Sequence, residues 1–172
     1  MRVMELNAPA AEFELSDPDG RVHRLSDYRG RIVIVNFWSC ECPHSERTDH
    51  SLLEMLSRWN GDLALLSIAP NVSEAPSAID SVARTRGLPL VLLDREHAVA
   101  DMYEAMTTPH AFLVDREGML RYRGAVDDVA FGRRQPSRFY LRGAIESLLR
   151  GESPLPGETL AYGCAIVREA LE

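Results

Sequence analysis

A buried strand that runs straight into a polar turn and an amphipathic helix constrains the fold of this chain more than any other feature. Residues 31–38, RIVIVNFW, form an almost unbroken β-branched and aromatic run, which is typical of a strand buried on both faces. The polar segment SCECPHS follows immediately, and Pro43 within it suits the first position of a helix. Apolar residues then recur at helical spacing until Asn60-Gly61, so we expect a helix over about 43–59.

Strand-like and helical patterns alternate along the rest of the chain. We expect strands at 63–69 and 89–94, helices at about 74–86 (capped by Ser73), 96–106 and 137–151, a β-hairpin of 110–115 and 119–124, and an N-terminal hairpin turning at Asp19-Gly20. Three parallel-type strands with intervening helices, followed by an antiparallel hairpin, predict an α/β fold in which helices cover both faces of a mixed sheet.

The length of the chain, 172 residues, is that of one ordinary domain. We therefore expect a single domain over 1–172, with an N-terminal hairpin extension at 1–30 and a C-terminal tail at 151–172. The tail begins with two prolines and a glycine, in the segment SPLPG, so we expect it to cross the surface before it docks.

Acidic residues outnumber basic ones, and this limits the partners. The 26 acids exceed the 19 bases, all of them Arg, so the net charge is −7 and nucleic acid is not expected as a partner. The longest apolar run is broken by Asn36 and is shorter than the roughly 18 to 20 residues of a membrane span. The first residues also contain acids where a secretory signal has its apolar stretch. We therefore expect a soluble protein of the cytoplasm, without a membrane partner.

Three cysteines carry the most informative chemistry. Cys42 is expected at the start of the helix over 43–59, where free amide groups and the helix dipole stabilise a thiolate and can lower a cysteine pKa to about 3.5 to 7.5. A protonated His44 would add a nearby positive charge, and Ser45 could donate a hydrogen bond to the same sulfur. The alternative is that Cys42 is a small apolar residue buried at a strand end.

Several motifs resemble the thioredoxin superfamily, whose usual motif is Cys-x-x-Cys at a helix start. The resemblance rests on Phe37-Trp38 and Cys42-Pro43 with the helix that follows, and on TTPHAFLVDREGMLRYRG at 107–124. It implies a thioredoxin-like fold in which Pro109, preceded by Thr108, is the cis-proline of that superfamily. Within the superfamily, the segments LSDYRGR, YRGAVDD and AYGCAIV resemble the peroxiredoxin-like branch, of the AhpC/TSA or redoxin type.

The sequence departs from these patterns at three places. Ser45 occupies the position of the second thiol in Cys-x-x-Cys, and Asn36 stands where thioredoxins often carry a buried Asp. Ser39 fits the Thr/Ser position of the peroxiredoxin motif, but Val35 stands where that motif has proline. We therefore rank thiol–disulfide exchange above peroxide reduction.

The resulting prediction is a thiol–disulfide oxidoreductase with Cys42 as the nucleophile. Cys40 or Cys164 would resolve the mixed disulfide: Cys40 through a small, strained Cys-x-Cys ring, and Cys164 if the tail docks beside Cys42. Thr108 and Pro109 would shape the substrate groove. Expected partners are a protein or small-molecule disulfide or oxidant and a thiol reductant, with no cofactor.

Other interpretations of the same residues remain open. Cys40, Cys42 and His44 could form a ligand set for Cu(I) or Zn(II), and a non-catalytic scaffold on this fold is a further alternative. Trp38 could flank the thiol or pack in the core, and His110 could line the site.

Overall fold

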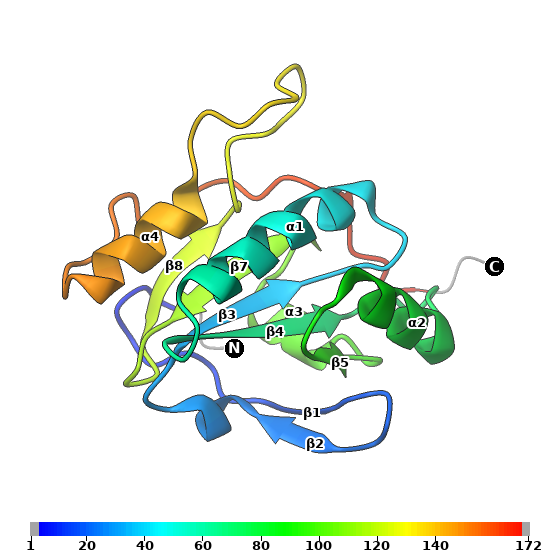
Figure 1. Ribbon diagram of the computed structural model, residues 1–172. Helices are drawn as coiled ribbons and strands as arrows, with labels where there is room; N and C mark the ends of the chain where they lie inside the picture. The colour runs from blue at the N-terminus through cyan, green and yellow to red at the C-terminus, as the bar shows by residue number, and fades with distance from the viewer. Residues whose placement is uncertain (1–3, 170–172) are drawn as a thin grey trace.

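A seven-stranded mixed sheet forms the centre of the molecule in the computed structural model, which describes residues 4–169 (Figure 1). The strands follow the spatial order β2-β1-β5-β4-β3-β7-β8. Their bounds are Glu14–Ser16 for β1, Val22–Arg24 for β2, Ile32–Phe37 for β3, Leu63–Ala69 for β4, Val91–Leu93 for β5, His110–Val114 for β7 and Leu120–Gly124 for β8. Strands β3, β4 and β5 are parallel, and the other pairs are antiparallel. The predicted mixed sheet is confirmed.

Helices cover the sheet on both faces because side chains alternate along the central strand. Ile32 and Ile34 of β3 pack on one face with α1 (Pro43–Arg58), α2 (Pro76–Arg86) and α4 (Tyr140–Leu149). Val33, Val35 and Phe37 pack on the other face with α3 (Ala98–Met102), the 3-10 turn Leu25–Tyr28 and the N-terminal segment. Because both faces of the sheet are covered, the residues of β3 that point to either face are apolar. The sequence of this strand is therefore an almost continuous apolar run.

The C-terminal tail runs back along the sheet, passes the start of α1 and reaches α3 and the loop between β4 and α2. At the free edge of β8, the amide of Arg123 donates to Gly157 and the amide of Thr159 donates to Arg123. Further on, β9 (Cys164–Ala165) pairs with β6 (Thr107–Thr108) in a separate two-stranded sheet. Residues 1–3 of the expected N-terminal extension and 170–172 of the expected tail lie outside the described residues.

Three of the predicted elements differ from those observed. Helix α2 begins at Pro76, and its N-cap is Ala75, so the predicted cap at Ser73 is wrong; proline at the first helical position lacks the amide that a cap would satisfy. Helix α3 spans 98–102 rather than 96–106, since His97 and Glu104 at its two ends have positive φ. Helix α4 begins three residues later than predicted, because Ser137 is hydrogen-bonded to Asp128 in the preceding loop.

Within residues 4–169, no helix is both long and apolar enough to cross a membrane.

The aromatic packing under β7 gives a test of the core. Phe112 is fully buried, and its ring lies 5.7 Å from Phe37 and 5.1 Å from Tyr103. We expect Phe112→Ala to lower the free energy of unfolding by about 3–5 kcal/mol, because it leaves a cavity among rings that cannot collapse. Denaturant unfolding measures the loss. Phe131→Ala is the matched control, since Phe131 is 97% exposed, and its effect should stay within about 0.5 kcal/mol. Equal losses in the two variants would contradict this packing.

Candidate functional site

Cys42 lies at the N-cap of α1, directly after the turn that leaves β3. Its backbone is extended, with φ −86° and ψ 118°, and Pro43 occupies the first helical position. The side chain of Glu74 stabilises this turn. It accepts hydrogen bonds from the hydroxyl of Ser39 at 2.9 Å and from the amide of Glu41 at 3.0 Å. The predicted position of this cysteine at a helix start is confirmed.

Hydrogen-bonding groups of both kinds surround the Cys42 sulfur, and Cys42 is only 3% exposed. The sulfur lies 2.7 Å from the sulfur of Cys164 and 3.1 Å from the carbonyl oxygen of Thr108. Burial raises the pKa of Cys42 and is the largest single influence, but hydrogen bonds from Cys164 and from the backbone amide of Ser45 outweigh it. The pKa of Cys42 is therefore lowered, as the helix-start argument predicts.

Cys164 reaches this sulfur because the tail docks against two segments. In the β6–β9 pair, Cys164 lies opposite Thr108. Beyond it, the amide of Val167 donates to the side chain of Asn71, and the carbonyl of Val167 accepts from Val72. Burial, the hydrogen bond with Cys42 and the negative charge of Cys42 raise the pKa of Cys164. The pKa values of the two thiols are therefore shifted in opposite directions, so Cys42 loses its proton at lower pH than Cys164.

The peptide bond between Thr108 and Pro109 is cis, which confirms the expectation drawn from the thioredoxin-like pattern. Thr108 is fully buried and presents its carbonyl oxygen to the Cys42 sulfur. A protonated Cys42 can donate to this oxygen, whereas an ionised Cys42 accepts from Cys164 instead.

Cys40 lies in a different environment from Cys42. It is 8% exposed and belongs to the apolar cluster on the α1 and α2 face of the sheet. Burial, together with the hydrogen bond and charge of Glu74, raises the pKa of Cys40 to about 12. A thiol held protonated in this way is a poor nucleophile at neutral pH.

Glu74 is a functional residue that the sequence analysis missed. Its side chain is 1% exposed, and while one carboxylate oxygen accepts from Ser39 and Glu41, the other is buried without a hydrogen-bond partner in the structure. Its negative charge contributes to the raised pKa values of both Cys40 and Cys164. A signal for it exists in the sequence: Glu74 follows the carboxyl end of β4, the neighbour of the strand that carries Cys42, and ends of parallel strands meet at one edge.

Three supporting residues have roles that differ in detail from those expected. The Ser45 hydroxyl accepts from the amide of Ser39, and it is the Ser45 backbone amide that bonds to the Cys42 sulfur. His44 packs its ring against Tyr162 at 5.0 Å, and its backbone amide bonds to Cys164. Trp38 is fully buried and donates to Asp49 at 2.8 Å, an arrangement that favours the core-packing interpretation.

Two further positions lie away from the sulfur pair. His110 stacks on Phe112 at 4.6 Å and accepts from the amide of Met106, and burial lowers the pKa of His110 to about 4. It lines a hollow with Tyr103 and Leu160 rather than with the cysteines. Asn36 is fully buried on β3, and neither of its side-chain polar atoms has a hydrogen-bond partner in the structure.

The metal-site alternative has no support in the geometry. Across the part of the chain that the structure describes, no three His, Cys, Asp or Glu side chains are grouped so that they could hold a metal ion. The expected set of Cys40, Cys42 and His44 fails because Cys40 packs into the apolar cluster while Cys42 faces Cys164.

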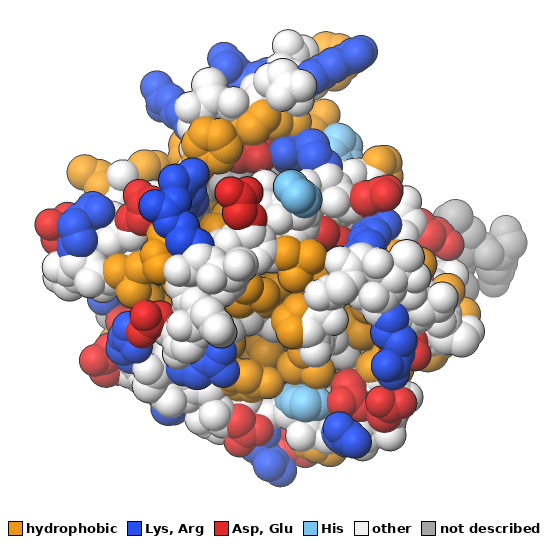
Figure 2. Space-filling view, viewed as in Figure 1, with side chains coloured by type: hydrophobic (Ala, Val, Ile, Leu, Met, Phe, Trp, Pro, Cys, Tyr) orange, Lys and Arg blue, Asp and Glu red, His pale blue; other side chains and the backbone are white. Residues whose placement is uncertain are grey.

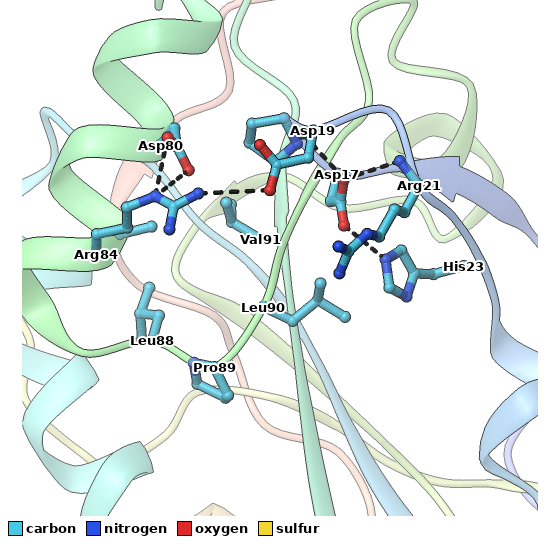
Figure 3. A pocket seen from close by; sticks show the side chains of 12 residues that line it. Asp17, Asp19, Arg21, His23, Asp80, Arg84, Leu88, Pro89, Leu90 and Val91 are labelled. Atoms are coloured by element: carbon cyan, nitrogen blue, oxygen red, sulfur yellow. Dashed lines mark hydrogen bonds and ion pairs between the residues drawn. The ribbon is translucent and has the colours of Figure 1, made fainter.

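A separate hollow of about 300 Å³ lies between the β1–β2 hairpin and α2 (Figure 3). Its charged groups pair with one another: Asp17 with His23 at 2.9 Å, and Arg84 with Asp80 and Asp19. Of these, only the Arg84–Asp19 pair, at 3.5 Å, joins the helix to the hairpin, and the residues that line the hollow include no cysteine.

Known proteins match this chain in sequence. Residues 6–123 match the model of the AhpC/TSA family. The thiol-disulfide oxidoreductase ResA of Geobacillus thermodenitrificans is 32% identical over 117 residues, which cover 67% of this chain and 67% of the relative.

Solved structures agree over nearly the whole chain. A hypothetical protein from Sinorhizobium meliloti 1021 has a TM-score of 0.87 at 27% identity, covering 99% of this chain and 98% of that one. An uncharacterized conserved protein from Geobacillus kaustophilus has a TM-score of 0.88 at 25% identity, covering 99% and 96%. A thiol-disulfide oxidoreductase from Bacteroides fragilis, at 21% identity and a TM-score of 0.60 over 67% and 88% of the chains, shows the fold alone. The thioredoxin-like fold is confirmed.

The hydrogen bond between the two sulfurs predicts a change in titration. We expect Cys164→Ala to raise the pKa of Cys42, because the variant loses the side-chain donor that most favours the thiolate. The rate of Cys42 alkylation by iodoacetamide, followed by peptide mass spectrometry against pH, should therefore have its midpoint at higher pH. Cys40→Ala is the control and should leave the midpoint in place. A midpoint that is the same in Cys164→Ala and the unmodified protein would contradict this account.

Gly163 allows the tail to approach the cis-proline segment. A Cβ at this position would lie 2.2 Å from the carbonyl oxygen of Thr108, so Gly163→Ala must displace β9. We expect this variant to lose about 1–3 kcal/mol of stability and to form the Cys42–Cys164 disulfide more slowly. Gly143→Ala in α4 is the control, because nothing lies within 4 Å of its added Cβ. Denaturant unfolding and quenched mass spectrometry measure the two effects; unchanged disulfide kinetics in Gly163→Ala would count against the docked tail.

Proposed function

The chain belongs to the AhpC/TSA family, and from that premise we propose that it is a thiol–disulfide oxidoreductase in which Cys42 attacks and Cys164 resolves. The observation that carries the proposal is the 2.7 Å separation of two free sulfurs, one of them at a helix start with a lowered pKa. The 32% identity to an oxidoreductase named for this reaction supports it.

The reaction proceeds in two exchanges. The Cys42 thiolate attacks one sulfur of a substrate disulfide, so that a Cys42–substrate bond forms and the other substrate sulfur leaves as a thiolate that takes up a proton. The thiol of Cys164 then loses its proton and attacks Cys42, which forms the Cys42–Cys164 disulfide and releases the second substrate thiol. The substrate is reduced by two electrons, and a thiol reductant returns the protein to its starting state.

The electrostatics of the site favour this order of events. While Cys42 is ionised, its negative charge is one cause of the raised pKa of Cys164. Formation of the mixed disulfide removes that charge, so the pKa of Cys164 falls when its thiolate is needed. Cys40 lacks this relation, because its pKa is raised by burial and by Glu74 and Glu41, and not by the charge of Cys42. We therefore propose Cys164, rather than Cys40, as the resolving residue.

Substrates of the expected kind are protein thiols and disulfides. Peroxide reduction, an antioxidant role and a cytoplasmic location stay predictions.

Disulfide mapping tests the proposal. The reduced protein is equilibrated with dithiothreitol buffers of defined potential, and its disulfides are mapped by mass spectrometry. We expect a Cys42–Cys164 bond with Cys40 reduced. In turnover of a disulfide-linked fluorescent peptide, Cys42→Ser should abolish activity, and Cys164→Ser should trap the substrate on Cys42. Cys40→Ser serves as the matched control and should retain activity. Full turnover by Cys164→Ser, or loss of turnover in Cys40→Ser alone, would assign the resolving role to Cys40.

A further inference from the structure

We propose that the loop between β8 and α4, residues 125–139, is a docking element that binds an acidic, extended segment of a protein substrate beside the cysteine pair. The inference rests on the proposed function and adds the chemistry of the partner. The loop projects from the body of the molecule between β8 and α4 (yellow in Figure 1).

The loop holds its shape through its own hydrogen bonds. Ala130 and Arg133 exchange backbone hydrogen bonds, and Gly132 between them has φ +82°. At the base, the side chain of Asp128 accepts from the amide and the hydroxyl of Ser137. Asp127 is buried and forms two hydrogen bonds with Arg47 of α1, at 2.7 and 3.0 Å. A partner would therefore meet a preformed surface, and binding would not have to order the loop.

A groove of about 520 Å³ separates the loop from the start of α1 and from the tail. One side consists of Val129, Ala130, Phe131 and the following glycine and arginines; the other consists of His44, Arg47 and Tyr162. Phe131 at the tip is 97% exposed. The space-filling view shows hydrophobic and arginine side chains together on the projecting loop (Figure 2). A large aromatic side chain held in water on a preformed loop is typical of a contact residue.

The arginines of the loop indicate the charge of the partner that it would bind. Arg133, Arg134 and Arg138 lie within it. Of its two acids, Asp127 pairs with Arg47, and Asp128 accepts from Ser137 and lies 3.7 Å from the guanidinium of Arg133. Among the described residues, Arg134 and Arg138 form no ion pair, so their guanidinium groups are available to a partner. The chain as a whole carries a net charge of −7. Two copies of the chain therefore repel each other through their net charge, and a symmetric contact between two copies of this loop would bring arginines together. The unpaired arginines instead favour an acidic segment of another protein.

The groove approaches the cysteine pair through His44 and Tyr162, although no cysteine lines it. His44 directly follows the proline at the first turn of α1, and Tyr162 lies two residues before Cys164. The rings of His44 and Tyr162 are in contact at a centroid distance of 5.0 Å and form the boundary between groove and sulfur pair. A segment bound along the arginines would therefore place its own cysteine next to Cys42.

Matched peptide substrates test this inference. Peptides of one sequence, each with a cysteine disulfide-linked to a fluorophore, carry flanking Asp-Leu-Asp, Asn-Leu-Asn or Arg-Leu-Arg. At low ionic strength we expect kcat/KM to be about tenfold higher for the acidic than for the basic peptide, and the difference to shrink at high salt. Arg133→Glu/Arg134→Glu should reverse the order, and Phe131→Ser should lower kcat/KM for all three peptides. Arg24→Glu/Arg150→Glu, an equal change in charge at exposed positions elsewhere, should leave the order intact.

Two controls separate this inference from the proposed function. Hydroxyethyl disulfide is small and neutral, and all the loop variants should reduce it at the rate of the unmodified protein. Failure of the unmodified protein to reduce it would overturn the proposed function itself. Normal reduction of it, with no preference among the peptides or a preference that survives Arg133→Glu/Arg134→Glu, would overturn the docking inference alone. Concentration-dependent self-association that Phe131→Ser abolishes would also overturn it, because the occupant would then be a second copy.

Discussion

The donors around one sulfur determine the chemistry of this protein. A buried thiolate loses its hydration, and that loss raises the pKa of Cys42 more than any other single influence. The amide of Ser45 and the thiol of Cys164 outweigh it, and both depend on the fold. The amide of Ser45 requires α1 to start at Pro43. The thiol of Cys164, 122 residues from Cys42 along the chain, requires the tail to pair with β6. The order of the strands in the sheet matters because it brings the start of α1 and the C-terminal tail to the same end of β3.

Local patterns were sufficient to predict the sheet, α1 and the position of Cys42. An unbroken apolar strand followed by Pro43 has few structural alternatives, and β4 was placed at 63–69 as observed. The choice between Cys40 and Cys164 could not be made in this way. Cys40 is two residues from Cys42 in sequence but packs into the apolar cluster, whereas Cys164 arrives through backbone pairing with Thr108. Pairing between segments that are distant in the sequence produces no local pattern from which the contact could be predicted.

Glu74 illustrates the same limit. Its importance comes from burial beside Ser39 and Glu41, and a single glutamate in a polar loop carries no sign of burial. Ser45 gives the converse case. It replaces the second thiol of the familiar motif, and its hydroxyl stabilises the turn by accepting from Ser39. In this chain the position has a structural role.

The path of the tail along β8 has a consequence beyond catalysis. An edge strand offers unpaired backbone groups to other molecules, and such edges lead to strand-to-strand polymerisation. Arg123 of β8 is engaged by Gly157 and Thr159, so the same segment that delivers Cys164 also shields this margin of the sheet. Detachment of the whole tail would therefore expose the Cys42 sulfur and the unpaired edge of β8 together.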